Sequence, residues 1–112
     1  MDSQLQGPIA LINVHTVEPK HQQEVLDITL NRSLQVARRW PGFISARYHV
    51  ALDKTRVTQV IYWENQEACL DFIKDPGTQE VLKQFAPLVQ QTESHFYTVV
   101  ADVVASQEAL PS

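Results

Sequence analysis

Hydrophobic and polar residues alternate from Val57 to Trp63, and this segment forms the centre of the predicted fold. A period of two places Gln59 and Trp63 on one face of a strand, together with two aliphatic residues. A strand whose side chains only fill an apolar core would not be expected to carry an amide at its middle. Because Gln59 stands in line with the flat indole of Trp63, the pattern indicates the wall of a small pocket for a flat organic ligand.

Three other segments have the length and composition of strands. Residues 9–17 are largely apolar on both faces, which is typical of a strand that is covered on both sides. Residues 43–52 lead through a short polar connection into the central strand, so these two strands should form an antiparallel hairpin. Strict alternation along this second strand places Phe43 and His49 on the same face. The last strand is predicted at residues 95–104.

The remaining periodic segments have helical spacing. In residues 21–40 the apolar positions recur at i, i+4, i+8 and i+11, namely Leu26, Leu30, Leu34 and Ala37. This spacing predicts a long amphipathic helix, which the Pro41-Gly42 pair ends. Residues 65–74 predict a second helix, and Pro76 interrupts it because the residue before a proline resists the helical conformation. Thr78 then caps a third, short helix.

The predicted order of elements is β-α-β-β-α-α-β, in which each helical block connects two strands. A right-handed crossover, a hairpin and a second crossover give an α+β, ferredoxin-like split βαβ fold with an antiparallel sheet and all helices on one face. We expect one folded domain at residues 9–104. A flexible N-terminus at residues 1–8 precedes it, and a C-terminal tail at residues 105–112 follows it.

The sheet face without helices is also predicted to be apolar. It carries aliphatic residues such as Ile12, Val14, Val60, Val99 and Val103. A patch of this kind is too apolar to remain in contact with water on a soluble protein. An isologous contact with the same face of a second copy would bury it, so we predict a homodimer.

The composition excludes several classes of partner. The 112-residue chain carries 9 basic and 13 acidic residues, and Arg38-Arg39 is its only adjacent basic pair, so nucleic-acid binding is not expected. The single cysteine, Cys69, provides neither an internal disulfide nor a thiolate cluster for a metal. We find no signal-peptide pattern and no apolar run near about 18 residues, so we expect a cytoplasmic protein without a membrane segment.

Three blocks of the chain resemble the antibiotic biosynthesis monooxygenase family. They are Ala10-Leu11-Ile12-Asn13, Pro41-Gly42-Phe43-Ile44-Ser45-Ala46, and Tyr62-Trp63-Glu64 followed by Glu67-Ala68. The resemblance runs from about Ile9 to Val104. Within the family, the stretch from Pro41 to His49 and the tail 109–112 are most similar to the cofactor-independent, anthrone-type branch of the actinorhodin pathway.

This resemblance implies both a fold and an activity. The implied fold is a dimeric α/β barrel with a ligand pocket in each subunit, between the sheet and the helices. The implied activity is oxidation of an electron-rich, polyketide-type phenol or anthrone by O2, to a quinone, without a metal or another cofactor. A small aromatic substrate, O2 and a second copy of the chain are therefore the expected partners.

The resemblance also assigns positions in the pocket. The tryptophan that lines the pocket matches Trp63, and the asparagine that precedes it in the family falls on Gln59. The family's tyrosine falls on Cys69, and its helical arginine falls near Leu82 or Lys83. Two polar anchors of the family are therefore changed in this chain.

The haem-degrading branch of the family is excluded by the same alignment. That branch uses an asparagine, a tryptophan and a histidine. Asn13 matches the asparagine, but the other two positions fall near Phe72 and Leu82. Without an axial histidine on that helix, haem degradation is not expected.

We predict that Gln59, Trp63 and His49 are catalytic. His49 is mid-strand and is the histidine we consider as the proton acceptor, whereas His15 is expected at the surface near a strand end. The predicted substrate-binding residues are Asn13, Phe72, Leu82 and Lys83. Trp63 is equally consistent with a core aromatic, Asn13 with a bond to Gln59, and Cys69 with a small buried hydrophobe.

Two other functions remain open at this point. The same scaffold serves small proteins that bind ligands or accompany stress without chemistry of their own, and fold alone is weak support for activity. A cyclase or isomerase on this scaffold would need the proton acceptor but no oxygen. Turnover without oxygen would separate that class from an oxygenase.

Overall fold

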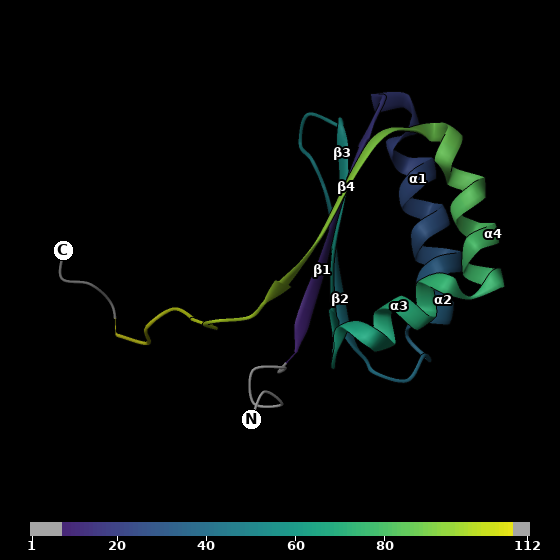
Figure 1. Cartoon of the computed structure of the whole chain (residues 1–112). Coiled ribbons are helices and arrows are strands. Elements are labelled where there is room, and N and C mark those ends of the chain that lie inside the picture. Colours follow the sequence, from purple (N-terminus) through teal and green to yellow (C-terminus); the bar gives the residue numbers. More distant parts are fainter. Residues whose placement is uncertain (1–7, 109–112) are drawn as a thin grey trace.

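A four-stranded antiparallel sheet carries all of its helices on one face (Figure 1). The computed structural model describes residues 8–108. The elements are β1 (Ile9–Val17), α1 (Gln22–Ile28), α2 (Leu34–Ala37), β2 (Phe43–Val50), β3 (Arg56–Trp63), α3 (Gln66–Lys74), α4 (Pro76–Phe85) and β4 (Val89–Thr98). The sheet order is β2-β3-β1-β4, so the predicted ferredoxin-like α+β fold is confirmed.

The two central strands, β1 and β3, fix which side chains face the helices. Asn13 pairs with Gln59, and Leu11 pairs with Ile61. Paired residues of an antiparallel sheet lie on the same face, so these four side chains all point toward the helices. Every second residue of β3, including Gln59 and Trp63, is buried. The prediction that an amide and an indole share the helix-covered face of this strand is therefore confirmed.

A bulge at the start of β2 reverses the predicted alternation there. Phe43 pairs with Trp63 but Ser45 pairs with Tyr62, so Ile44 is an extra residue on β2. Phe43 consequently lies on the helix-covered face, where its ring meets the Trp63 indole edge to face at 5.6 Å between centroids. The prediction that Phe43 shares a face with His49 is wrong, because strict alternation does not anticipate an inserted residue.

The long first helix is interrupted by a wider turn. Residues 29–33 form a π-helical turn between α1 and α2, closed by a hydrogen bond from the Leu34 amide to the Thr29 carbonyl. The Thr29 hydroxyl donates to the carbonyls of Val25 and Leu26. A single π turn inside a helix is frequent at functional sites. Helicity in this region was predicted, but this turn was not.

Two side-chain caps define the second helical block. Asn65 accepts a hydrogen bond from the Ala68 amide at the start of α3, and Asp75 accepts one from the Thr78 amide at the start of α4. The helix break before Pro76 is therefore confirmed. The prediction that Thr78 is the cap is wrong, because α4 already begins at Pro76 and Asp75 supplies the capping carboxylate.

The last strand begins earlier than predicted. β4 covers residues 89–98, and Thr92 and Ser94 pair with His15 and Asn13 of β1. The stretch 90–94 lacks apolar alternation, but backbone hydrogen bonds to β1 hold it in the sheet regardless of its side chains. Residues 99–108 follow β4 and leave the body on the side opposite the helices (Figure 1).

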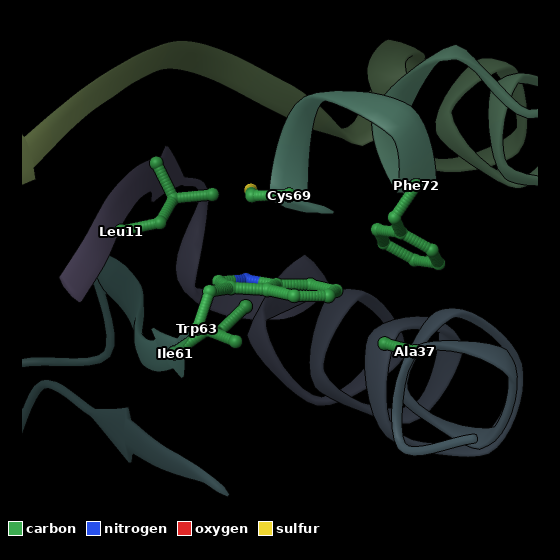
Figure 2. Packing of buried hydrophobic residues seen from close by; sticks show 6 residues of the cluster. All are labelled: Leu11, Ala37, Ile61, Trp63, Cys69 and Phe72. Carbon is green, nitrogen blue, oxygen red and sulfur yellow. The ribbon is translucent and has the colours of Figure 1, made fainter. Parts of the chain in front are cut away.

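The interior contains two apolar clusters. One is formed by Leu11, Ala37, Ile61, Trp63, Cys69 and Phe72, and Figure 2 shows its side chains around the indole. The other is formed by Val17, Val25, Val57 and Phe85. Along the strands, Asn13, His15 and Gln59 lie between the two clusters. A polar band therefore crosses the helix-covered face of the sheet.

Gly42 fixes how closely α3 approaches the end of the first helical block. Its φ is +92°, and a Cβ atom at this position would lie 2.6 Å from the Cβ of Ala68. Its carbonyl accepts a hydrogen bond from the Glu64 amide at 2.8 Å. Glycine is needed here because the φ angle is positive and because a Cβ atom would collide with Ala68. This residue therefore sets the position of α3 over Trp63.

The open face of the sheet carries Ile12, Val14 and Val60. The homodimer through this face stays a prediction. Val99 and Val103, which were assigned to the same face of the last strand, lie beyond the end of β4. Val103 is 85% exposed, so its predicted place in a strand is wrong. Within residues 8–108, no helix has the length and apolar character needed to cross a bilayer.

Two predicted segments lie partly outside the described residues. The expected flexible N-terminus, 1–8, is described only at Pro8, which belongs to no helix or strand. The expected tail, 105–112, is described as far as residue 108 and contains no helix or strand up to that point. The resemblance of residues 109–112 to the anthrone-type branch also lies outside the described part of the chain.

Candidate functional site

A cavity of about 540 Å³ lies between the sheet and the helices. Strands β1, β3 and β4 form its floor, and the π turn, α3 and α4 form its roof. Five of the predicted site residues line it together: Asn13, Gln59, Trp63, Phe72 and Leu82. Its size lies within the range of pockets that hold small organic ligands.

Two amides meet on the floor of the cavity. Asn13 Nδ2 donates to Gln59 Oε1 at 2.9 Å, across the β1–β3 pair. Gln59 is only 5% exposed, so this bond satisfies one of its polar atoms inside the protein. The Gln59 amide nitrogen and the Asn13 amide oxygen remain available to a molecule in the cavity.

Three buried polar atoms have no hydrogen-bond partner among the described residues. They are His15 Nε2, Trp63 Nε1 and Thr78 Oγ1. All three side chains line the same cavity. A buried polar atom without a partner costs about 1–3 kcal/mol, and such atoms are rare in folded proteins. Their gathering around one cavity gives a molecule that enters it, water or a polar ligand, several atoms to bond.

His15 is buried at the polar end of the cavity. Its side chain is 4% exposed, its Nδ1 lies 2.9 Å from Thr92 Oγ1, and its ring meets Phe85 edge to face. Burial lowers the pKa of His15, and a weaker interaction with Gln59 opposes this shift. The expectation that His15 lies at the surface is wrong, because β4 pairs alongside it and α4 covers it. Its position two residues after Asn13 was the signal that placed it on the pocket face.

Cys69 closes the cavity over the indole. It is fully buried, as predicted, and Figure 2 shows it beside the Trp63 ring. Burial raises the pKa of the Cys69 thiol to about 12, so it remains protonated near neutral pH. Within residues 8–108, no group of three His, Cys, Asp or Glu side chains is arranged to hold a metal ion.

Two predicted site residues are not part of this cavity. His49 pairs with Thr58 on the opposite face of the sheet, where it lines a separate hollow together with Arg47 and Tyr62. Lys83 points away from the cavity, is 74% exposed and pairs with Glu80 at 3.5 Å. The prediction that they act in the same pocket as Gln59 is wrong, because side-chain direction on β2 and α4 turns both outward.

Trp63 has both roles that the sequence left open. It is 1% exposed and belongs to an apolar cluster, with Phe72 tilted beside it at 5.6 Å between ring centroids. Its indole also lines the cavity, and its Nε1 has no partner within residues 8–108. An indole held in this way offers a rigid apolar wall and one hydrogen-bond donor.

Comparison with known proteins gives consistent matches. The family model for antibiotic biosynthesis monooxygenases matches residues 8–84. Tetracenomycin-F1 monooxygenase from Streptomyces glaucescens is 30% identical over 69 residues, which are 62% of this chain and 62% of that protein. This alignment therefore spans less than two thirds of the relative's length.

Solved structures show the same fold. The monooxygenase from the gene ActVA-Orf6 of Streptomyces coelicolor, crystallised in complex with nanaomycin D, matches with a TM-score of 0.77 and 25% identity, over 90% of this chain and 94% of that chain. SnoaB, a cofactor-independent oxygenase from Streptomyces nogalater, matches with a TM-score of 0.73 and 18% identity, over 87% and 97% of the two chains.

Proposed function

This chain belongs to the antibiotic biosynthesis monooxygenase family, and from that premise we propose that it oxidises an electron-rich phenol or anthrone with O2 and needs no cofactor. The substrate binds in the cavity between the sheet and the helices. The product is a quinone. Relatives named as a cofactor-independent oxygenase and as a tetracenomycin-F1 monooxygenase support this choice of chemistry.

The observation that carries the proposal is the combination of surfaces around the cavity. A flat aromatic wall, formed by Trp63 and Phe72, stands beside the Asn13–Gln59 amide pair. Unpartnered polar atoms of His15 and Thr78 face the same space. A fused-ring molecule with oxygen atoms on its rim would satisfy both the apolar wall and the polar atoms, whereas a purely aliphatic ligand would leave the polar atoms without partners.

The chemistry balances without an added reductant. A CH2 group flanked by aromatic rings loses a proton to give a carbanion, and one electron passes from it to O2. The resulting radical and superoxide combine, which forms the C–O bond of a peroxide. Loss of the second C–H proton and cleavage of the O–O bond then release water and leave a carbonyl, so that CH2 and O2 become C=O and H2O.

The residues of the cavity would lower the barrier in two ways. Negative charge grows on the substrate oxygen as the proton leaves, and the amide nitrogen of Gln59 is a donor held ready for it by the bond to Asn13. Trp63 and Phe72 hold the rings in one plane and exclude water from the radical pair. Removing one such donor costs about 10²–10³ in kcat in well-studied enzymes.

Oxygen uptake with an anthrone as substrate tests the proposal. The purified protein, treated with a chelator, should consume O2 faster than the spontaneous oxidation of the anthrone. Gln59→Leu should lower kcat by about 10²-fold. Thr58→Val, a change on the adjacent residue of the opposite face, is the matched control and should retain the activity. Uptake no faster than in buffer, or equal rates for Gln59→Leu and the wild-type protein, would contradict the proposal.

The same assay separates the two other functions. An anthrone or hydroxyquinone that binds without any turnover would indicate a binding protein. The change of two polar anchors, one at Cys69 and one near Leu82 or Lys83, favours this interpretation. Conversion of a polyketide-type substrate under nitrogen would indicate a cyclase or isomerase. Conversion that needs O2 in equal molar amount supports the oxygenase.

The homodimer is a second part of the proposal. Its support is the open face of the sheet, where Ile12, Val14 and Val60 lie without a covering helix. Sedimentation of the wild-type protein should give the mass of two chains. Val60→Glu, which places a charge at the centre of this face, should shift the equilibrium toward one chain. A wild-type protein with the mass of one chain would refute the dimer.

A further inference from the structure

We propose that His15 is the proton acceptor of the reaction, and that its Nε2 atom takes the first proton from the substrate in the cavity. This inference rests on the proposed function and adds the group that starts it. It replaces His49, which lies on the other face of the sheet. The proposal rests on a buried imidazole that has one nitrogen bonded to Thr92 and the other beside the cavity, without a partner among residues 8–108.

The position of His15 suits contact with a bound molecule. It lies on the central strand β1, two residues after Asn13, and both side chains line the cavity with Gln59. The amide donor and the proposed base therefore stand on one floor. A phenol or enol whose oxygen accepts from Gln59 would bring an acidic proton close to this group of side chains.

Thr92 orients the imidazole through its contact with Nδ1. When Nδ1 carries the proton and donates to Thr92 Oγ1 across 2.9 Å, Nε2 has a free lone pair toward the cavity. Phe85 holds the ring from the α4 side, at 5.2 Å between centroids. Thr92 is thus a positioning residue, and a buried neutral imidazole held in one orientation is suited to accept a proton through Nε2 in this tautomer.

No charged group competes with His15 inside the cavity. The residues that face it are Val57 and Gln59 from β3, Thr92 from β4 and Phe85 from α4, and none of them titrates. Glu93 pairs with Val14 and so lies on the opposite face. Cys69, the other titratable side chain in the lining, has a pKa near 12. His15 is therefore the described lining residue that offers a neutral nitrogen as a proton acceptor, since burial lowers its pKa.

His15 takes up the first proton and gives it back at the end of the reaction. Nε2 takes the proton from the substrate and becomes part of an imidazolium, next to a substrate anion that transfers one electron to O2. After the C–O bond has formed, the second C–H bond and the O–O bond break. The second C–H proton passes to the distal peroxide oxygen, which departs as hydroxide. This hydroxide takes the proton from the imidazolium and leaves as water, which returns His15 to its neutral form.

A spectroscopic titration tests the proton transfer apart from the oxidation. The probe is 2-hydroxyanthraquinone, an inert phenol whose phenolate absorbs at longer wavelength. Bound to the wild-type protein, it should show about tenfold more phenolate relative to phenol at a given pH than when bound to His15→Gln. His49→Gln is the matched control and should behave as the wild type. Equal phenolate ratios for His15→Gln and the wild-type protein would overturn the proposal.

Kinetics provide the second readout. On an anthrone, His15→Gln should lower kcat by about 10²–10⁴-fold with little change in KM. Added imidazole should restore part of the activity of His15→Ala. In the wild type, kcat should fall as pH drops toward the pKa of His15, which burial lowers below its ordinary value, and Thr92→Val should displace that limb without a large change in KM. A folded His15→Gln protein with wild-type kcat would refute the role of His15.

The outcomes distinguish this inference from the proposed function. Wild-type protein that lacks O2 uptake but ionises the bound phenol through His15 would refute the oxygenase and leave the proton acceptor. O2 uptake that is unaffected by His15→Gln would refute the proton acceptor and leave the oxygenase. Failure of the probe to bind to either protein would count against the cavity as a site, and so against both.

Discussion

The two faces of one sheet carry the same kinds of residue with different consequences. His15 on β1 points under the helices, is 4% exposed and has one nitrogen without a partner. His49 on β2 points to the open face and is exposed. Their residue type is identical, so the difference comes from what covers them. Burial under α4 lowers the pKa of His15 and keeps it neutral, which is the form that can accept a proton.

Two neighbouring polar residues of β3 show the same contrast at shorter range. Gln59 and Thr58 are neighbours on β3, but only Gln59 lies under the helices, where it bonds Asn13. A polar group on the covered face must find a partner or destabilise the fold, whereas one on an open face bonds water. Polar residues under the helices are therefore the stronger candidates for a site.

The largest expected effect is a loss of stability when the packing between the sheet and the helices is disrupted. Trp63→Ala removes the largest fully buried side chain and its contacts with Phe43 and Phe72. We expect a loss of about 3–5 kcal/mol in the free energy of unfolding, measured by urea denaturation. Tyr62→Ala, on the open face, should cost about 1 kcal/mol or less in an isolated chain. An equal loss of unfolding free energy for the two variants would show that Tyr62 is buried as deeply as Trp63.

A smaller effect is expected from the amide pair. Gln59→Leu removes the acceptor of the Asn13 Nδ2 bond and leaves that donor buried, so it should cost about 1–3 kcal/mol. The double change Asn13→Leu with Gln59→Leu should cost less than the sum of the two single changes. Strict additivity in urea denaturation would show that the two side chains act independently and that the bond contributes nothing.

The pH dependence of stability separates the two histidines. Because burial lowers the pKa of His15, the unfolded chain binds a proton at a pH where the folded chain does not. The contribution of His15 to the free energy of unfolding should therefore be complete above pH 6.5, the ordinary pKa of histidine. The free energy of unfolding should fall as pH drops from there toward the lowered pKa.

Unfolding midpoints between about pH 7.5 and pH 5 measure this slope. His15→Gln should flatten it in that window, whereas His49→Gln should leave it as in the wild type. A slope that survives His15→Gln unchanged would assign the pH dependence to other groups and would remove the contrast between the two faces.

The smallest expected effect concerns Lys83. Its ammonium lies 3.5 Å from Glu80, but the two side chains are 74% and 71% exposed. Exposed ion pairs contribute about 0.2–1 kcal/mol at most, so Lys83→Ala should change the urea midpoint very little. It should also leave ligand affinity unchanged, measured with the same hydroxyanthraquinone. A clear loss of affinity would show that this lysine reaches the cavity after all.

Much of the fold followed from local pattern. The long helix, the hairpin of β2 and β3 and the break before Pro76 were all predicted, because period, turn residues and proline act within a few residues of one another. The errors have equally local causes. A one-residue bulge at Ile44 reversed the parity at the start of β2, and a polar stretch at residues 90–94 concealed half of β4.

The candidate site was predicted in part for the same reason. Parity alone put Gln59 and Trp63 on one face, and it placed His15 with Asn13. The burial of His15 was missed because it depends on Thr92, 77 residues away in the chain, and on α4. The cavity-facing hydroxyl of Thr78 was missed because the capping role belongs to Asp75.

The sequence by itself determined which side chains point the same way along each strand, since backbone geometry turns successive residues to opposite faces. It also determined the family and the order of elements. Only the tertiary structure decided which face the helices cover, where the cavity remains, and which polar atoms are left without partners beside it. These features arise from contacts between residues far apart in the chain, and no local pattern encodes the space that such contacts enclose.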